Sequence, residues 1–232
     1  MPDILVYIKS GANEELRYAI RTWQKNLEFD RLCVVGGPKP DWLVPDIYIE
    51  NPAHYAKMRQ CYDNLIKALS DDRLTDDIIL LMDDVFIINY VGEWDINYNR
   101  GTLQQHWDRA VGNGVPSSYD DQVMATNDYL EGIGIIRPLS FEEHAPFLCN
   151  RHKLLDILND IGPKKMDNLL YRSIYGNIHN IDTKFKLDYK IVKKGERPMM
   201  NELVVSTNET SFRGSIGNVI KSYFPEKSKY EK

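Results

Sequence analysis

The chain has 232 residues, enough for one α/β domain with a sizeable core, and 34 acidic against 29 basic side chains leave a net charge of −5. That balance gives no general electrostatic attraction to nucleic acid or to an anionic membrane. Three scattered cysteines argue against a disulfide framework, and we see no export signal and no apolar run of the roughly 18–20 residues that a membrane-spanning helix needs, so we expect a cytoplasmic protein without membrane insertion.

The first half of the chain alternates between strand-like and helix-like segments. Short apolar runs predict strands at residues 4–8, 31–35 and 47–49, and helical spacing of apolar residues predicts helices at 13–27 and 53–69. This alternation is typical of a mainly parallel sheet with helices on both faces. Such folds bind ligands at the carboxyl ends of their strands.

The helix at residues 13–27 carries several polar candidates near its start. Asn13 is a good N-cap, and Glu14 lies in the first turn, where the helix dipole favours acids. Arg17 and Arg21 are four residues apart and therefore share one face of the helix. Guanidinium groups suit phosphate oxygens, but the pattern alone favours ordinary solvated charge.

Two adjacent acids follow the next predicted strand, at residues 78–82. Asp83 and Asp84 separate this strand from a second apolar run at residues 85–88. A buried carboxylate without a partner is costly, and two hard oxygen ligands suit Mg²⁺ or Mn²⁺. The alternative is a plain turn in which Asp83 caps a neighbouring helix. We favour a metal or catalytic site, with Asp84 as the direct ligand and Asp83 as its support, because consecutive strand residues point to opposite sides.

Residues 92–132 are predicted to form an excursion from the sheet. Aromatic side chains among polar ones suit stacking on a sugar or base, and equally suit ordinary half-buried surface. Helices are expected at residues 102–110, 119–130 and 166–178, a further helix near Arg151, and a late strand at 185–192. Residues 184–197 carry six basic side chains, which makes them the local candidate for binding a polyanion. Residues 221–232 have no periodicity and are either partly disordered or packed back on the domain.

Several short motifs occur together in one order along nearly the whole chain. They include Asn13 to Tyr18 with Arg21, Pro40 to Leu43, Met82 to Phe86, His144 to Pro146, Ser173 to Asn177, Ser206 to Asn208 with Phe212, and Phe224 to Glu231. This set resembles a family of phage- and prophage-encoded glycosyltransferases and, in fewer blocks, the Stealth-type sugar-phosphate transferases. A Trp-Val-Asp-Gly block of the Stealth group is absent, because residues 7–10 read Tyr-Ile-Lys-Ser. We therefore favour plain glycosyl transfer.

The resemblance implies a GT-A-like, Rossmann-like fold, with one catalytic domain at residues 1–220, an acceptor-side excursion at 92–132 and a tail at 221–232. It also implies a nucleotide-sugar donor whose diphosphate binds Mn²⁺ or Mg²⁺, and an acceptor hydroxyl on modified DNA, a protein or a glycan. A sugar-1-phosphate transferase and a non-catalytic binding module are the alternatives. The implied catalytic residues are Asp83, Asp84 and His144, where His144 completes the metal shell or acts as a base, and the implied donor contacts are Asn13, Glu14, Arg17, Arg21, Arg172 and Asn177.

Overall fold

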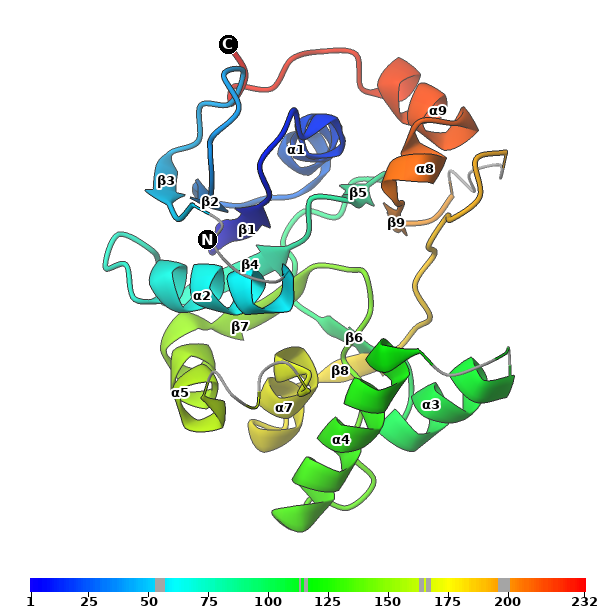
Figure 1. The fold of residues 1–232 in the computed structure, drawn as a ribbon. Coiled ribbons are helices and arrows are strands. Elements are labelled where there is room, and N and C mark those ends of the chain that lie inside the picture. Colours follow the sequence, from blue (N-terminus) through cyan, green and yellow to red (C-terminus); the bar gives the residue numbers. More distant parts are fainter. Residues whose placement is uncertain (53–56, 113, 115–116, 163–164, 166–167, 196–200) are drawn as a thin grey trace.

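The computed structural model describes residues 1–232 apart from 53–56, 113, 115–116, 163–164, 166–167 and 196–200. Its centre is a five-stranded sheet in the order β3-β2-β1-β4-β7 (Figure 1). The first four strands in sequence are parallel, and β7 joins β4 as an antiparallel edge strand. The bounds are Asp3–Ile8 for β1, Leu32–Gly36 for β2, Ile47–Glu50 for β3, Asp77–Leu81 for β4 and Phe147–Asn150 for β7.

Helices cover both faces of this sheet. Alternate residues of β1 enter different cores, with Ile4 and Val6 packed in the core that includes α1 (Glu14–Asn26) and Leu5 in the core that includes α2 (Lys57–Leu69) and α5 (Arg151–Ile161). Strands buried on both sides need apolar residues at every position. This explains why β1 and β4 read as continuous apolar runs, and it confirms the predicted mixed α/β fold with a mainly parallel sheet.

Smaller elements complete the structure beside the central sheet (Figure 1). Strand β5 (Val85–Ile87) pairs antiparallel with β9 (Val204–Ser206), and β6 (Asn97–Asn99) pairs with β8 (Thr183–Phe185). The remaining helices are α3 (Leu103–Gly112), α4 (Ser118–Gly132), α7 (Tyr171–Ile178), α8 (Glu209–Phe212) and α9 (Ser215–Tyr223). None of the helices in the described part of the chain has the length and apolar character needed to span a bilayer.

Most predicted elements are present within a few residues of their expected bounds. The predicted helix at 13–27 is α1, the helices of the excursion are α3 and α4, and the helix near Arg151 is α5. The predicted helix at 53–69 is seen as α2, and its first four residues lie outside the described part of the chain. Strand β4 ends at Leu81, so the two aspartates lie in the turn that follows it.

Two expectations about the second half were wrong, and one strand was missed. Strand β7 was not predicted. Of the helix predicted at 166–178, residues 166–167 lie outside the described part of the chain, and α7 begins at Tyr171 because the preceding Leu170 is extended and its amide donates to Thr126 Oγ1 at 2.9 Å. The late strand predicted at 185–192 ends at Phe185, where the pairing with β6 stops. All three differences come from tertiary contacts that local propensity does not contain.

The last residues of the chain are packed on the domain. Helix α9 runs across the predicted boundary at residue 220 and ends at Tyr223. Phe224 and Tyr230 are buried at 5% and 1% exposure, although Tyr223 stays exposed. Of the two alternatives for this tail, the packed one is therefore correct.

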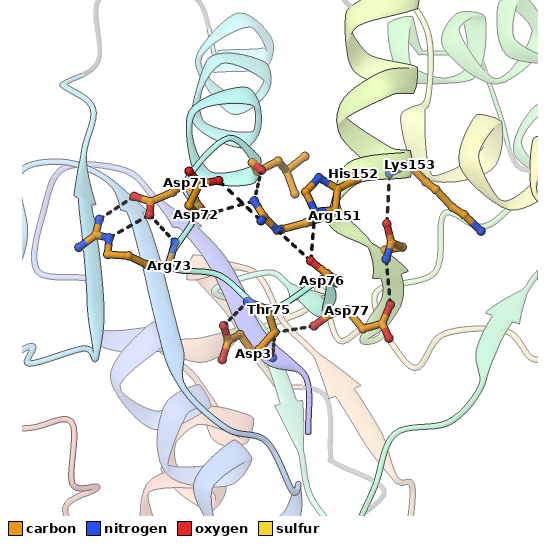
Figure 2. Close-up of polar contacts among 12 residues, drawn as sticks. Asp3, Asp71, Asp72, Arg73, Thr75, Asp76, Asp77, Arg151, His152 and Lys153 are labelled. Atoms are coloured by element: carbon orange, nitrogen blue, oxygen red, sulfur yellow. Dashed lines mark hydrogen bonds and ion pairs between the residues drawn. The ribbon is translucent and has the colours of Figure 1, made fainter.

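A polar network fastens the amino ends of β1 and β4 (Figure 2). The fully buried Asp3 accepts a hydrogen bond from the Thr75 amide at 2.9 Å, and the Asp3 amide donates to Thr75 Oγ1 at 3.0 Å. Nearby, Arg151 Nη1 donates to the carbonyls of Leu69 and Asp71, which ties α5 to the end of α2. These hydrogen bonds hold the amino ends of β1 and β4, and this edge of the sheet is here named the anchoring edge.

Candidate active site

A cleft of about 310 Å³ lies at the opposite edge, where β1 and β4 end. Its walls come from the loop after β1, the first turn of α1, the turn after β4, and α8. The lining residues are Lys9, Ser10, Gly11, Ala12, Asn13, Glu14, Glu15, Asp83, Glu209, Phe212 and Arg213. The Asp83-Asp84 turn thus lies at the ligand-binding edge that the order of strands and helices predicted.

Glu15 lies within electrostatic range of Asp83 and Asp84 beside this cleft. Oδ1 of Asp84 is buried and has no hydrogen-bond partner among the described residues, while the Asp84 carbonyl accepts from the Thr207 amide at 3.0 Å. Burial raises the pKa of Glu15, and the charges of Asp83 and Asp84 raise it further, against a hydrogen bond of 2.7 Å from Thr207 Oγ1. The sequence prediction named Glu14, whereas the charges of Asp83 and Asp84 raise the pKa of its neighbour Glu15.

This excess of negative charge fits a divalent cation at Asp83 and Asp84. In the ranges that the structure describes, however, no three His, Cys, Asp or Glu side chains are grouped to hold a metal, so the predicted set of both aspartates and His144 does not assemble. Magnesium commonly uses one or two carboxylates and takes its other oxygens from substrate phosphates and water. The two aspartates suit that kind of incomplete site.

Asn13 does not cap α1 with its side chain. It adopts the left-handed conformation, with φ of 49°, and its amide group donates to the carbonyls of Lys9 at 2.9 Å and Gly11 at 3.0 Å. Asn13 is thus the N-cap residue of α1, as predicted, but its side chain makes no capping hydrogen bond because it turns back into the loop. Its Oδ1 is buried beside the cleft without a hydrogen-bond partner in the described structure.

The cleft also has two cations that the sequence did not single out, Lys9 and Arg213. Lys9 follows β1 directly, and Arg213 follows α8, where it forms an ion pair with Glu209. A lysine just after the first strand of a parallel sheet is a usable signal, because that strand end borders the ligand edge. Arg213 lies far along the chain, and no local pattern marked it.

The other residues predicted on the first helix have partners elsewhere. Glu14 forms an ion pair with Lys221 at 2.9 Å. The guanidinium of Arg17 lies over the Trp42 ring, 4.7 Å from its centroid, and Arg21 binds Glu231 through two hydrogen bonds of 2.7 and 2.8 Å. The two arginines are therefore neither freely solvated nor part of the lining of the cleft.

Arg172 and Asn177 support the segment that carries His144. Arg172 donates to the carbonyls of Glu143 at 2.8 Å and Ala145 at 3.1 Å. Asn177 exchanges two hydrogen bonds with the backbone of Leu139, at 2.7 and 2.8 Å. The structure thus engages both side chains with backbone groups on either side of residues 140–142.

His144 lies between two charged side chains. Its Nδ1 is 2.7 Å from Asp188 Oδ2, and its Nε2 is 2.7 Å from Lys190 Nζ. An ammonium group can only donate, so Nε2 accepts and the ring proton on Nδ1 is donated to Asp188. Burial alone would raise the pKa of Asp188, but the hydrogen bond from His144 and the charge of Arg100 hold it below the ordinary value.

Glu143 is the second unusual acid of this cluster. It is 1% exposed, and its Oε1 lies 3.2 Å from Arg100 Nε. Burial and the charge of Asp188 together raise the pKa of Glu143 to about 8 despite Arg100, so it keeps its proton at neutral pH. Opposite pKa shifts in neighbouring carboxyl groups are typical of functional sites. Of this cluster the sequence indicated His144 alone, since the partners of His144 lie more than 40 residues away.

The cleft and the His144 cluster are neighbours across β9. Val85, which follows the aspartate turn, pairs with Ser206 of β9, and Ser206 also forms a parallel bridge with Lys190. Adjacent strands are about 4.8 Å apart, so the backbones of Val85 and Lys190 are separated by roughly 10 Å. The aspartate turn and the His144 cluster therefore lie on opposite sides of β9.

We expect Glu143→Gln to make the protein relatively more stable at alkaline pH. The unfolded chain loses the Glu143 proton near pH 4.5, but the folded chain keeps it until about pH 8. Between these values the folded state binds more protons, so the parent loses stability as pH rises. The variant should gain about 1–3 kcal/mol on the parent across this window, measured by urea unfolding at several pH values. The exposed Glu209→Gln is the control, and parallel pH curves for parent and Glu143→Gln would contradict the assignment.

Comparison with known proteins identifies the fold of this chain. No protein-family model and no curated protein sequence matches the chain. A solved structure of the galactosyltransferase LgtC in complex with donor and acceptor sugar analogs matches 97% of this chain and 96% of its own, with a TM-score of 0.50 and 10% identity. A structure of an active-site mutant of LgtC matches 88% of this chain and 86% of its own, with a TM-score of 0.46 and 13% identity. The chain thus has a GT-A-like glycosyltransferase fold, while the resemblance to phage and Stealth-type enzymes finds no support here.

Proposed function

We propose that this protein is a metal-dependent glycosyltransferase that moves a sugar from a nucleoside diphosphate sugar to an acceptor hydroxyl. The observation that carries this proposal is the buried Asp84 Oδ1, which lacks a hydrogen-bond partner in the described structure and lies at the carboxyl end of a central strand. The fold similar to that of a galactosyltransferase supports a ligand-binding role for this position, because mainly parallel sheets bind ligands at the carboxyl ends of their strands.

The donor would bind in the cleft beside the aspartate turn. Asp83 and Asp84 would hold Mn²⁺ or Mg²⁺, which supplies Lewis-acid stabilisation of the leaving diphosphate when bound. Lys9 and Arg213 line the same cleft and add positive charge for the phosphates. The Oδ1 of Asn13, which has no hydrogen-bond partner in the described structure, is suited to accept a hydrogen bond from a hydroxyl group or the nucleobase of the nucleotide sugar.

The acceptor would bind on the other side of β9, next to His144. Its Nε2 lone pair, which accepts a hydrogen bond from Lys190 in this structure, would take the proton from an acceptor hydroxyl that replaces Lys190 as its partner. Asp188 holds the Nδ1 proton and stabilises the imidazolium that forms. Of the two roles expected for His144, we therefore assign it the base.

The basic segment at residues 184–197 gives little support to DNA as the acceptor. Lys186 lies 3.5 Å from Glu202 and Lys190 bonds to His144, so both turn toward protein groups. Arg197 lies outside the described residues. We favour a glycan or protein hydroxyl, and charge reversal at Lys184 should accordingly leave DNA affinity and its salt dependence unchanged.

The test is a thermal-shift screen of nucleotide sugars with and without Mn²⁺, followed by product analysis. A true donor should raise the melting temperature most when the metal is present, because a ligand bound only by the folded state stabilises it. Release of a nucleoside diphosphate would support glycosyl transfer. Release of a nucleoside monophosphate would indicate sugar-phosphate transfer, and binding without turnover would indicate a non-catalytic module.

A further inference from the structure

Residues 228–232, here named the C-terminal strap, are fastened to α1. Glu231 of the strap is almost fully buried and receives the forked pair of bonds from Arg21, Nε to Oε1 at 2.7 Å and Nη2 to Oε2 at 2.8 Å. The remaining Arg21 nitrogen, Nη1, donates to the carbonyls of Phe224 at 3.1 Å and Pro225 at 2.8 Å. Bidentate charged pairs are strong and geometrically specific, so the position of the strap is well defined.

The strap in turn holds the segment that carries Trp42. The Lys232 amide donates to the Trp42 carbonyl at 2.9 Å, and the Val44 amide donates to the Tyr230 carbonyl at 2.8 Å. These two bonds run in opposite directions, as in a short antiparallel pair. The Trp42 ring is further covered by the Arg17 guanidinium. The place of the indole therefore depends on the strap.

The indole then reaches the loop that lines the proposed donor cleft. Trp42 Nε1 donates to the Ala12 carbonyl at 2.9 Å. Ala12 belongs to residues 9–13, every one of which lines the cleft, whereas no residue of the strap does. Inside the loop, the Asn13 side chain bonds to the carbonyls of Lys9 and Gly11. The loop is thus braced from within by Asn13 and from outside by Trp42.

We propose that the C-terminal strap positions this loop through Trp42, which makes Arg21, Glu231 and Trp42 positioning residues for nucleotide binding. The chain of contacts is continuous from Arg21 to Glu231, along the strap to Trp42, and from Trp42 to Ala12. That the loop receives a nucleoside diphosphate rests on the proposed function. The proposal that the strap positions the loop does not depend on which ligand the cleft binds.

The test compares Trp42→Phe and Arg21→Lys with the parent. Trp42→Phe keeps a ring beneath Arg17 but removes the indole donor, and Arg21→Lys removes the fork that holds Glu231. Two quantities are measured: the rate of trypsin cleavage after Lys9 in the free protein, and the affinity for UDP, GDP, ADP and dTDP with Mn²⁺. Cleavage should be about threefold to tenfold faster and binding about threefold to tenfold weaker, since one hydrogen bond is lost and proteolysis follows the open population.

Arg31→Lys is the matched control. Arg31 forks onto Asp3 with bonds of 3.1 and 2.9 Å, in the same way as Arg21 onto Glu231, but at the anchoring edge. It should lower the melting temperature and leave Lys9 cleavage at the parent rate. Unchanged cleavage in Trp42→Phe would overturn the inference, and so would an equal increase in Arg31→Lys. If the parent binds none of the four nucleotides, the proposed function fails, while the cleavage rates still decide the role of the strap.

Discussion

Asp84→Asn should weaken Mn²⁺-dependent binding of a nucleoside diphosphate by roughly 100-fold, the scale expected when a charged group essential to a metal or phosphate site is lost. The same substitution should leave the free protein as stable as the parent, or more stable. Its Oδ1 is buried and lacks a hydrogen-bond partner among the described residues, so the folded state loses no bond at that oxygen and is relieved of a negative charge beside Glu15. Calorimetric titration and thermal unfolding without metal measure the two effects separately.

Asp3→Asn is the control for this experiment. Asp3 is fully buried, whereas Asp84 is half-buried, and the Asp3 carboxylate accepts hydrogen bonds from Arg31 and Thr75 at the anchoring edge. Its loss should cost stability because partners are left unpaired, and it should not change nucleotide affinity. A strongly destabilised Asp84→Asn that still binds nucleotide and metal normally would show that the aspartate turn is only structural.

His144→Gln should lower the rate of sugar transfer about 10²- to 10⁴-fold while the affinity for the donor stays the same. The imidazole bonds to Asp188 and Lys190 and lies across β9 from the aspartate turn, so its removal affects the proposed acceptor side. Donor hydrolysis by water gives a first readout, and transfer to an acceptor gives the second.

His152→Gln is the control for the histidine experiment. His152 is also paired with an aspartate, Asp76, at 3.1 Å, but it is about half exposed and lies at the anchoring edge (Figure 2). It should transfer sugar at the parent rate. If His144→Gln instead lost Mn²⁺ binding together with donor binding, His144 would be a metal ligand and its assignment as a base would be wrong.

Sequence reasoning located the fold and one half of the candidate site for physical reasons. Strands buried on both faces must be apolar throughout, so β1 and β4 were readable from composition alone. The Asp83-Asp84 pair was visible because charge is unusual beside such a strand. Both signals depend only on residues that are adjacent in the chain, so both can be detected in a single sequence.

The other half depends on pairs that are distant in sequence. Asp188 and Lys190 meet His144 only because the chain after β8 returns to lie beside β9, and Arg21 meets Glu231 across 210 residues. No periodicity or spacing announces such contacts. The Arg21 side chain therefore looked like a phosphate ligand, although the structure uses it to hold the C-terminal strap.

The central position of β1 has a consequence for how the molecule moves. The strand is paired on both sides, its residues Ile4 to Val6 are fully buried, and Asp3 fastens its first amide to Thr75. Amide hydrogens at its centre should exchange with solvent only through global unfolding, whereas those of the loop that follows can exchange through small local openings. One strand thus connects the centre of the sheet to the loop that lines the cleft, so local opening of that loop leaves the sheet intact.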